Sequence, residues 1–438
     1  MAVAFKRDPY PGKPKILFIG LAESTHTRSW IDLLSNTEMN VRLFALPSGD
    51  PPDDWWVRTY ITSGSHRKKL GNRKYLFSGI RGMFDYVVNK LINKRIIQID
   101  DNVNNYFMNS NQSNDFELSS SGRGSLPGHF TPEAKLAQVI TRWRPDIIQT
   151  LGLFDGQGGW FYYKVRKAYH LENHGKWLIQ LRGGSDLTLR KHDPANMGVI
   201  RSMLMDCHQI ITDNRINIAF ATNLGIPERK FAPISPLPGT GGVDLGVLGL
   251  SDLIPPSKRE RIVLWPKAYE SPWSKALPVL ESLKIAWQSI FPCEIRLLAV
   301  TPEVKSWFLA LPQQIRQHCT LLDRITREEV LELMKKTRVL LAPSLVDGIP
   351  NILYEAMAYG VFPIVSPLET ICTIVEKDEN VLFARNLYPE EIASALTRAM
   401  SDDKLIDEAA VRNIKIVRRF ADRKQIAPLV IDYYHSLI

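Results

Sequence analysis

The chain has 438 residues, of which 45% are hydrophobic and 23% charged, as in an ordinary globular protein. This length exceeds what one hydrophobic core usually serves and predicts two domains of about 200 residues each. The formal net charge of +9 favours an anionic partner, such as a nucleotide, a phospholipid surface or a nucleic acid. No apolar run approaches the roughly 20 residues that cross a bilayer, and the start of the chain lacks the apolar core of a signal peptide.

Four cysteines are spread along the chain without the paired spacing of a zinc site or a disulfide framework. They are Cys207, Cys293, Cys319 and Cys372. Unpaired thiols are typical of a reducing compartment. The sequence therefore predicts a cytoplasmic protein.

The first predicted strand, 15–20, is a short apolar run that ends in a glycine, as in the first strand of a doubly wound α/β domain. No Gly-x-Gly-x-x-Gly follows it, and those glycines let a backbone approach a dinucleotide pyrophosphate. Their absence argues against a dinucleotide-dependent oxidoreductase. Ser24 can cap a helix that carries Trp30 and Leu34 on its inner face, and 41–46 is the next predicted strand.

The segment 67–97 is strongly basic. Its apolar residues recur at helical spacing: Phe77, Ile80, Phe84, Val87, Val88, Leu91 and Ile92. A basic amphipathic helix can lie in an anionic membrane interface, but it can equally pack its apolar side on a sheet. The basic residues lack the interleaved aromatic pattern of nucleic-acid-binding modules, so we expect no nucleic-acid partner.

The stretch from about 100 to 128 is rich in Asn, Ser, Asp and Gly. Such a composition cannot bury enough apolar area to offset the entropy of ordering. We therefore expect a mobile insertion in the N-terminal domain. A helix over 134–143 and a strand over 145–152 are predicted to follow it.

A predicted strand over 177–181 leads into the turn Arg182-Gly-Gly-Ser-Asp186. The glycines would let a ligand approach the backbone closely, and Arg182 could pair with a phosphate or a carboxylate. The alternative is an ordinary surface turn. Prolines and glycines then cluster from 233 to 256, which marks the boundary between the two domains.

The second domain opens with a predicted strand over 261–265, and Lys267 and Lys275 follow it, eight residues apart. Fixed cations can stabilise the negative charge that develops on a departing phosphate without help from a metal. The chain has no Asp-x-Asp motif that could hold a metal. The alternative is that both lysines are solvated residues of a loop.

The stretch 338–365 is the most informative part of the chain. Its two ends are apolar runs typical of buried parallel strands. Between them, Pro350 is suited to begin a helix and Gly360 to terminate it after Tyr359. Within that helix Glu355 has apolar neighbours, where a carboxylate without a partner is rare.

Asp347 precedes the same helix, and a helix N-terminus favours anions. Two acids beside this terminus, at the carboxyl edge of a parallel sheet, could hold sugar hydroxyls next to a phosphate. The alternative is that Asp347 is only a helix cap and that Glu355 pairs with a local lysine or arginine.

Asp347 and Glu355, spaced as acid-x7-acid and followed by Ala-Met-Ala-x-Gly and an apolar strand, resemble the signature of glycosyltransferase family 4. The resemblance implies the GT-B fold, an α/β architecture of two Rossmann-like doubly wound domains facing a central cleft. It implies an N-terminal acceptor domain over 1–240 and a nucleotide-sugar domain over 241–420. A C-terminal helix over 421–438 would cross back to the N-terminal domain.

The resemblance also assigns roles to residues. In the family the first acid, usually Glu, contacts the transferred sugar and the second holds the donor ribose, and two cations grip the donor diphosphate. The catalytic residues expected on this basis are Asp347, Lys267 and Lys275. The donor-binding residues are expected to be Glu355, Gly348, Ile349, Pro350, Arg324 and Thr370. The residues expected at the acceptor side of the cleft are His26, Arg182 and Asp186.

The expected activity is transfer of a sugar, with retention of configuration, from a nucleotide-diphosphate sugar to a glycan or lipid-linked acceptor in cell-envelope polysaccharide synthesis. The nucleotide sugar is a co-substrate, and we expect no resident cofactor and no metal. The protein would work in the cytoplasm, with a possible peripheral contact of 67–97 on the inner face of the plasma membrane. Two alternatives remain open, namely a non-catalytic scaffold that binds a glycan or a membrane, and a sugar-nucleotide epimerase or phosphorylase of the same fold.

Overall fold

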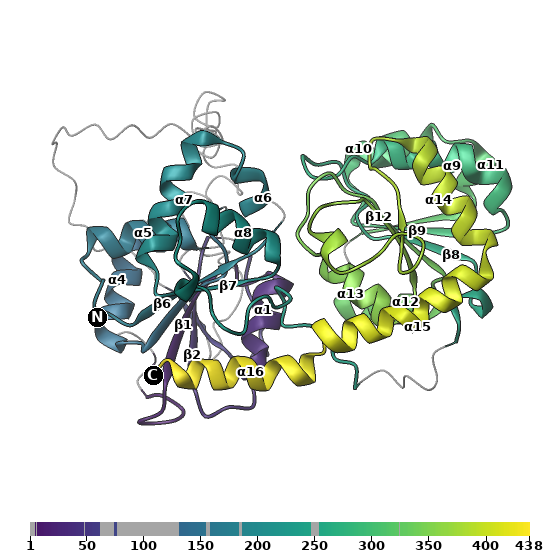
Figure 1. The fold of residues 1–438 in the computed structure, drawn as a ribbon. Helices are drawn as coiled ribbons and strands as arrows, with labels where there is room; N and C mark the ends of the chain where they lie inside the picture. The colour runs from purple at the N-terminus through teal and green to yellow at the C-terminus, as the bar shows by residue number, and fades with distance from the viewer. Residues whose placement is uncertain are drawn as a thin grey trace, which may run out of the picture.

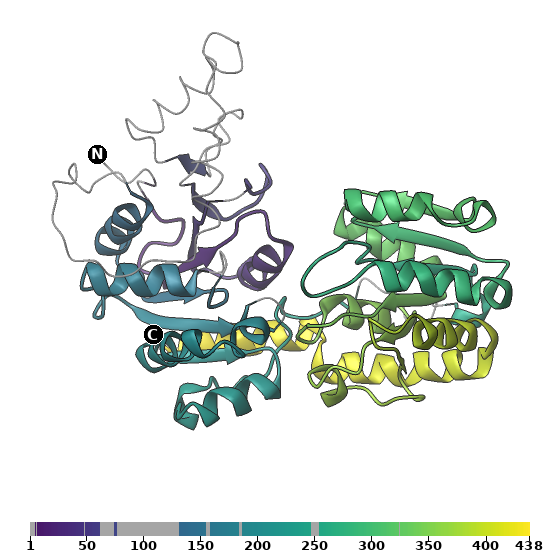
Figure 2. The same cartoon turned by 90° about the horizontal axis from the view of Figure 1, so that it is seen from above.

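The structure, a computed structural model, describes residue 5 and residues 7–47, 49–61, 74–76, 131–154, 158–183, 186–246, 254–323 and 325–438. These residues form two α/β lobes, each built around a parallel sheet (Figure 1). The two sheets remain separate when the molecule is viewed from above (Figure 2). The predicted fold class is therefore confirmed. The expected insertion at 100–128 lies outside the described residues, as does the segment 67–97 apart from a strand at 74–76.

The sheet of the N-terminal lobe has the order β4-β3-β2-β1-β5-β6-β7 among the described strands, and every neighbouring pair is parallel. Its strands are β1 (Lys15–Gly20), β2 (Asn40–Ala45), β3 (Arg58–Ile61), β4 (Lys74–Leu76), β5 (Ile147–Thr150), β6 (Lys176–Leu181) and β7 (Gln209–Thr212). The helices of this lobe are α1 (Thr25–Ile31), η1 (Asp32–Leu34), α4 (Pro132–Trp143), α5 (Gly159–Ala168), α6 (Leu187–Arg190), α7 (Pro194–Asp206), α8 (Arg215–Asn223) and η2 (Glu228–Lys230).

Helices cover both faces of this sheet because successive strand residues point to opposite sides. Leu17 and Ile19 of β1 belong to one buried cluster with α4, α5 and α7. Ile16 and Phe18 belong to another with α1 and the C-terminal helix α16 (Arg423–Ser436). The strand is apolar along its whole length for this reason.

The sheet of the C-terminal lobe has the order β10-β9-β8-β11-β12-β13 and is parallel throughout its described strands. The strands are β8 (Ile262–Trp265), β9 (Glu294–Leu298), β10 (Cys319–Leu322), β11 (Val339–Ala342), β12 (Phe362–Val365) and β13 (Leu382–Phe383). The helices are η4 (Pro256–Lys258), α9 (Leu277–Ile290), α10 (Pro302–Leu309), α11 (Gln313–Arg316), α12 (Arg327–Lys336), α13 (Asn351–Ala358), η5 (Ile371–Thr373), α14 (Pro389–Ser401) and α15 (Asp403–Phe420). Among the described helices of both lobes, none is long and apolar enough to cross a membrane.

The C-terminal helix α16 leaves the end of α15 and runs along the N-terminal lobe (Figure 1). Its fully buried Tyr434 accepts a hydrogen bond from Trp30 Nε1 at 3.1 Å and donates one to Gln149 Oε1 at 2.5 Å. Arg423, the first residue of the helix, donates to the carbonyl oxygen of Ser29 at 2.7 Å. These contacts attach the last segment of the chain to its first α/β lobe.

Two helix ends differ from the sequence-based expectations. The helix expected to start at Pro350 begins at Asn351, because Pro350 has a ψ of 133° and is therefore an extended N-cap. The helix expected over 421–438 begins at Arg423, because Asp422 is an extended cap whose side chain accepts from Lys424 N. Cap geometry rather than apolar periodicity sets both boundaries.

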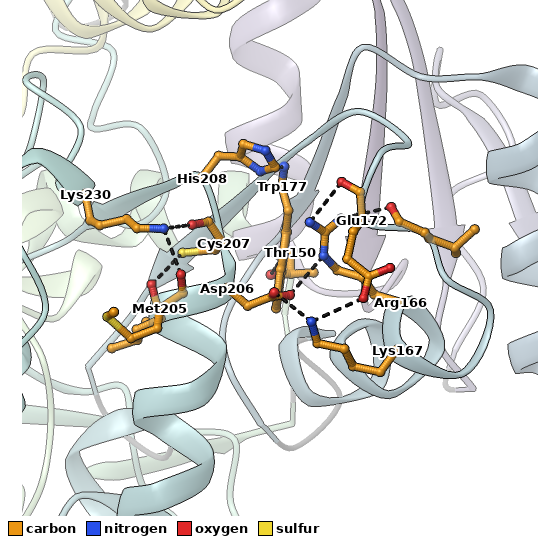
Figure 3. A network of polar contacts seen from close by, with 12 residues as sticks. Thr150, Arg166, Lys167, Glu172, Trp177, Met205, Asp206, Cys207, His208 and Lys230 are labelled. Atoms are coloured by element: carbon orange, nitrogen blue, oxygen red, sulfur yellow. Dashed lines mark hydrogen bonds and ion pairs between the residues drawn. The ribbon is translucent and has the colours of Figure 1, made fainter.

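A polar network ties α5 to the end of α7 in the N-terminal lobe (Figure 3). Arg166 Nε donates to Asp206 Oδ2 at 2.9 Å, and its Nη1 donates to the carbonyl oxygen of Leu171 at 3.0 Å. Lys167 pairs with Asp206 at 2.8 Å and with Glu172 at 3.2 Å. Each cation of the network has a protein partner, so the network stabilises the lobe and leaves no obvious place for a ligand.

Candidate active site between the two lobes

A cavity of about 520 Å³ separates the two lobes, and both contribute to its walls. Arg182 and Gly183 follow β6 in the N-terminal lobe, whereas Lys267 follows β8 and Asp347 follows β11 in the C-terminal lobe. Loops after the carboxyl ends of parallel strands are the usual place for a ligand in this class of sheet. We therefore take this cavity, called the cleft below, as the candidate active site.

Lys267 and Asp347 form an ion pair on the wall of the cleft. The side chain of each is 19% exposed, so the pair is shielded from bulk water but accessible to a ligand. The second oxygen of Asp347, Oδ1, accepts a hydrogen bond from Gly348 N at 2.9 Å. Burial acts to lower the pKa of Lys267, but the negative charge of Asp347, the nearby Tyr269 and the hydrogen bond to Asp347 together outweigh it and raise the pKa above its ordinary value. Lys267 is therefore a fixed cation at neutral pH.

Glu355 pairs with Arg327 in the same cleft. Arg327 Nε donates to Glu355 Oε1 at 2.8 Å, and Glu355 is only 8% exposed. Burial raises the pKa of Glu355, and the positive charge of Arg327 acts against this rise. Glu355 thus has an arginine partner, which is distant in sequence and not the local one of the alternative, and the carboxylate lines the cleft.

Arg327 is a cleft residue that the sequence analysis did not name. It is the first residue of α12, which starts with a capping box formed by Thr326 and Glu329. The pattern Thr-x-x-Glu is a sequence signal for a helix start and could have placed Arg327 at the carboxyl edge of the sheet. The expected donor-binding residue Arg324 lies outside the described residues.

His26 contacts the C-terminal lobe across the cleft. Its Nδ1 lies 2.9 Å from Asn351 Nδ2, and Thr240 Oγ1 donates to Asn351 Oδ1 at 2.7 Å. Desolvation of the ring by the walls of the cleft, together with the positive charge of Arg182, lowers the pKa of His26 to about 4, although the residue keeps an exposed side. The imidazole is neutral near pH 7, so Nδ1 accepts from the Asn351 amide and Nε2 carries the proton.

The two lobes are in close backbone contact at a pair of glycines, Gly183 and Gly348. A Cβ atom built on Gly183 would lie 2.2 Å from the Cα of Gly348. Asp213 supports this contact, because its Oδ2 accepts from Gly183 N at 2.9 Å while its Oδ1 accepts from Asn217 Nδ2 at 2.9 Å. Burial raises the pKa of Asp213 to about 6. Neither Asp213 nor the glycine pair was anticipated from the sequence.

Arg182 and Asp186 line the cleft but are also part of its framework. Arg182 Nη2 donates to Gln180 Oε1 at 2.9 Å and to the carbonyl oxygen of Gly239 at 3.0 Å, and burial lowers the pKa of Arg182 to about 10. Asp186 accepts from Leu153 N at 2.8 Å. Arg182 is therefore buried and contacts the linker, so the turn that it begins is not the ordinary surface turn of the alternative.

Two expected site residues do not line the cleft. Lys275 Nζ pairs with Glu270 Oε1 at 2.6 Å, and Lys275 is not among the residues that line the cleft. Thr370 Oγ1 donates to the carbonyl oxygens of Asp347 and Gly348 at 3.1 and 3.0 Å. Thr370 thus holds the loop that carries Asp347, whereas the expected donor-binding segment from Gly348 to Pro350 lines the cleft directly.

Comparisons with known proteins agree with this architecture. Residues 305–416 match the family model described as glycosyl transferases group 1. No curated protein matches the chain. The crystal structure of Anabaena HepE with UDP and glucose is similar over 97% of this chain and 100% of its own, with a TM-score of 0.62 and 13% identity. The fold is that of the GT-B glycosyltransferases.

Two further structures extend this fold likeness. A glycosyltransferase from Rickettsia africae aligns over 97% of this chain and 99% of its own, with a TM-score of 0.59 and 13% identity. The lipopolysaccharide outer core galactosyltransferase WaaB aligns over 97% and 100%, with a TM-score of 0.56 and 12% identity. The family-model match includes α12, Asp347 and Glu355, whereas the match to these structures spans both lobes.

Proposed function

We propose that this protein is a retaining glycosyltransferase that uses a nucleotide-diphosphate sugar. The observation that carries the proposal is the gathering of two acids and a fixed cation, Asp347, Glu355 and Lys267, in one cleft between two Rossmann-like lobes. The matched family model and the glycosyltransferase fold support the reaction class. The acid-x7-acid resemblance to glycosyltransferase family 4 supports retention.

The charges in the cleft suggest how the donor binds. Lys267 and the N-terminus of α13 are both positive, and a diphosphate would be stabilised between them. Glu355, held by Arg327, would accept hydrogen bonds from the ribose hydroxyls. The sugar would then lie against Asp347 on one side and His26 on the other, because these two residues line opposite walls of the cleft.

The proposed reaction exchanges one bond at the anomeric carbon for another on the same face. The bond from this carbon to the phosphate oxygen breaks and the bond to the acceptor oxygen forms, while the acceptor proton passes to the leaving phosphate. Lys267 stabilises the charge of the departing diphosphate and so supplies what a metal would otherwise provide. His26 cannot serve as the base, because Nδ1 is occupied by Asn351 and Nε2 already carries a proton. It can donate a hydrogen bond to the sugar.

The acceptor and the location are proposed from a structural neighbour and from the charge of the chain. WaaB is described as a lipopolysaccharide outer core galactosyltransferase, which supports a glycan or lipid-linked acceptor in the cell envelope. We place the reaction in the cytoplasm, at the inner face of the plasma membrane, because the net charge of +9 favours an anionic surface. The basic segment 67–97 would make that contact.

A thermal-shift screen against UDP-, GDP-, ADP- and dTDP-sugars tests the proposal, and UDP-glucose comes first because HepE was crystallised with it. A donor that binds should raise the melting temperature by mass action. The anomeric configuration of the product, followed by proton NMR, then tests retention. Products formed from the donor alone would instead indicate an epimerase or a phosphorylase. A chain that binds a glycan but none of the donors would be a scaffold.

A further inference from the structure

A second cavity of about 400 Å³, called the linker cavity below, lies where the connection between the lobes passes. Its walls come from the start of α8, from the linker residues 236–238, and from α13 and the end of α15. It is distinct from the cleft, although Asp213 and Ile349 line both. None of the roles proposed above uses it.

Tyr354 of α13 lines the linker cavity with an unused hydrogen-bonding group. The residue is only 3% exposed. Its hydroxyl makes no hydrogen bond with any residue in the described part of the chain. The hydroxyl is not one of the fully enclosed, unsatisfied polar atoms of the described chain and is reached from the cavity, so a ligand atom there can accept its hydrogen bond.

Two arginines, one from each lobe, also line this cavity. Arg215 is the first residue of α8, and Arg419 is the penultimate residue of α15. Neither forms an ion pair or a hydrogen bond within the residues that the structure describes. The guanidinium of Arg419 lies 4.8 Å from the ring centroid of the adjacent Phe420, which is a cation–π contact. The positive charges of Arg215 and Arg419 are therefore not neutralised by an acid of the described chain, and both residues are exposed.

The rest of the cavity wall is largely apolar. Leu237 of the linker, Ile349 of the loop before α13 and Phe420 at the end of α15 contribute carbon surface to it. Asp213 contributes a carboxylate, but hydrogen bonds from Gly183 N and from two asparagine amides already occupy its oxygens. The cavity thus offers positive charge and a hydroxyl donor beside an apolar surface.

We propose that the linker cavity binds a small amphiphilic phosphate monoester, with its phosphate between Arg215 and Arg419 and its apolar part against Leu237 and Phe420. A phosphate is favoured over a carboxylate because its three terminal oxygens can accept from two guanidinium groups and from Tyr354 at once. The same chemistry occurs in a free metabolite and in a lipid headgroup. Binding in the linker cavity does not depend on the proposed glycosyl transfer, whereas the coupling to donor binding described next rests on it.

A ligand in this position would connect the two lobes. Ile349 is adjacent to Gly348, which contacts Gly183 of the N-terminal lobe, and Asp213 supports that contact. An anion held by one arginine from each lobe would restrain their separation at the linker. Occupation of the linker cavity would therefore affect the width of the cleft, and donor binding and phosphate binding would be coupled reciprocally.

Isothermal titration of the full chain with octyl phosphate, below its micelle concentration and without donor, tests the proposal. Arg419→Ala should raise the Kd about tenfold and Tyr354→Phe about fivefold, as expected for a lost charged and a lost neutral hydrogen bond. The matched control is Arg418→Ala, which removes the same charge from the neighbouring exposed position of α15 without altering the lining of the cavity. Its Kd should equal that of the wild type.

Equal weakening by Arg418→Ala and Arg419→Ala would overturn the site, because it would show binding to general positive charge. Lack of binding by the wild type would overturn it as well. Tyr354→Phe removes a hydroxyl without a protein partner, so this variant should fold and melt like the wild type. Vesicles containing phosphatidic acid distinguish the two sources of the ligand: Arg419-dependent co-sedimentation indicates a lipid, whereas binding of octyl phosphate alone indicates a free metabolite.

Discussion

Gly183 and Gly348 meet across the cleft so closely that a Cβ atom on Gly183 would lie 2.2 Å from the Cα of Gly348. The atom in the way is backbone, which cannot rotate aside as a side chain would. Gly348 directly follows Asp347, and Gly183 follows Arg182. The separation of these two glycines therefore sets the distance between the walls of the candidate active site.

Gly183→Ala should hold the lobes apart. Overpacking of this kind typically costs about 1–3 kcal/mol, so we predict that kcat/KM for the donor falls about tenfold. The measurement is steady-state kinetics with the best donor. Gly198→Ala on α7 is the matched control, because a Cβ there meets nothing within 4 Å, and its activity should be unchanged. Equal activity of the two variants would contradict the importance of the contact.

Glu355→Ala should weaken donor binding about 10- to 100-fold, because it removes the proposed acceptor of the ribose hydroxyls and leaves Arg327 without its carboxylate partner. Titration calorimetry with the donor measures the effect. Glu328→Ala is the control, since it removes an exposed acid from the first turn of α12, the helix that carries Arg327. An unchanged affinity in Glu355→Ala would remove Glu355 from the site.

Asp213 should make stability depend on pH. Its pKa in the folded protein is raised from 3.8 to about 6 by burial, so the folded state holds the proton more tightly than the unfolded state does. The resulting stabilisation is complete below about pH 4 and is lost as the pH rises to about 6. We predict that the unfolding free energy of the wild type, relative to Asp213→Asn, falls by about 3 kcal/mol across this window. Urea denaturation of both proteins between pH 4 and 7 measures this difference. If the unfolding free energies of the wild type and Asp213→Asn changed in parallel with pH, the raised pKa of Asp213 would be contradicted.

His26 should not titrate near neutral pH. With a pKa of about 4, its ring stays neutral from pH 5 upward, so this residue should give no acidic limb in the activity profile between pH 5 and 8. NMR of the imidazole carbon-bound protons, assigned with His26→Gln, measures the titration directly. A midpoint between pH 6 and 7 would show that the cleft does not lower the pKa of His26.

The fold could be predicted because its signals are local. Short apolar runs such as 338–342 and 361–365 correspond to buried parallel strands, β11 and β12, whose side chains are covered on both faces. The helix between them is set by Pro350 and Gly360, whose backbone preferences act on adjacent residues alone. Such preferences need no knowledge of distant parts of the chain.

The site could be predicted only in part, because its geometry depends on distant pairs. Glu355 stood out as an acid among apolar residues, but its partner Arg327 lies 28 positions away and is brought near by the packing of α12. Asn351 looks like an ordinary first residue of a helix, and its contacts with His26 and Thr240 exist only once the lobes meet. Lys275 had a suggestive spacing, yet a nearby acid, Glu270, pairs with it instead.

The most direct test of the proposed function is the rate of nucleoside diphosphate release from the best donor in the presence of an acceptor. The wild type should release the nucleotide, and Lys267→Ala should lose about 100-fold or more in kcat, because the charge on the leaving group is no longer stabilised. Lys284→Ala, which removes a lysine of α9 paired only with Glu281, should match the wild type. Absence of release and of binding for every donor, or full activity in Lys267→Ala, would contradict the account.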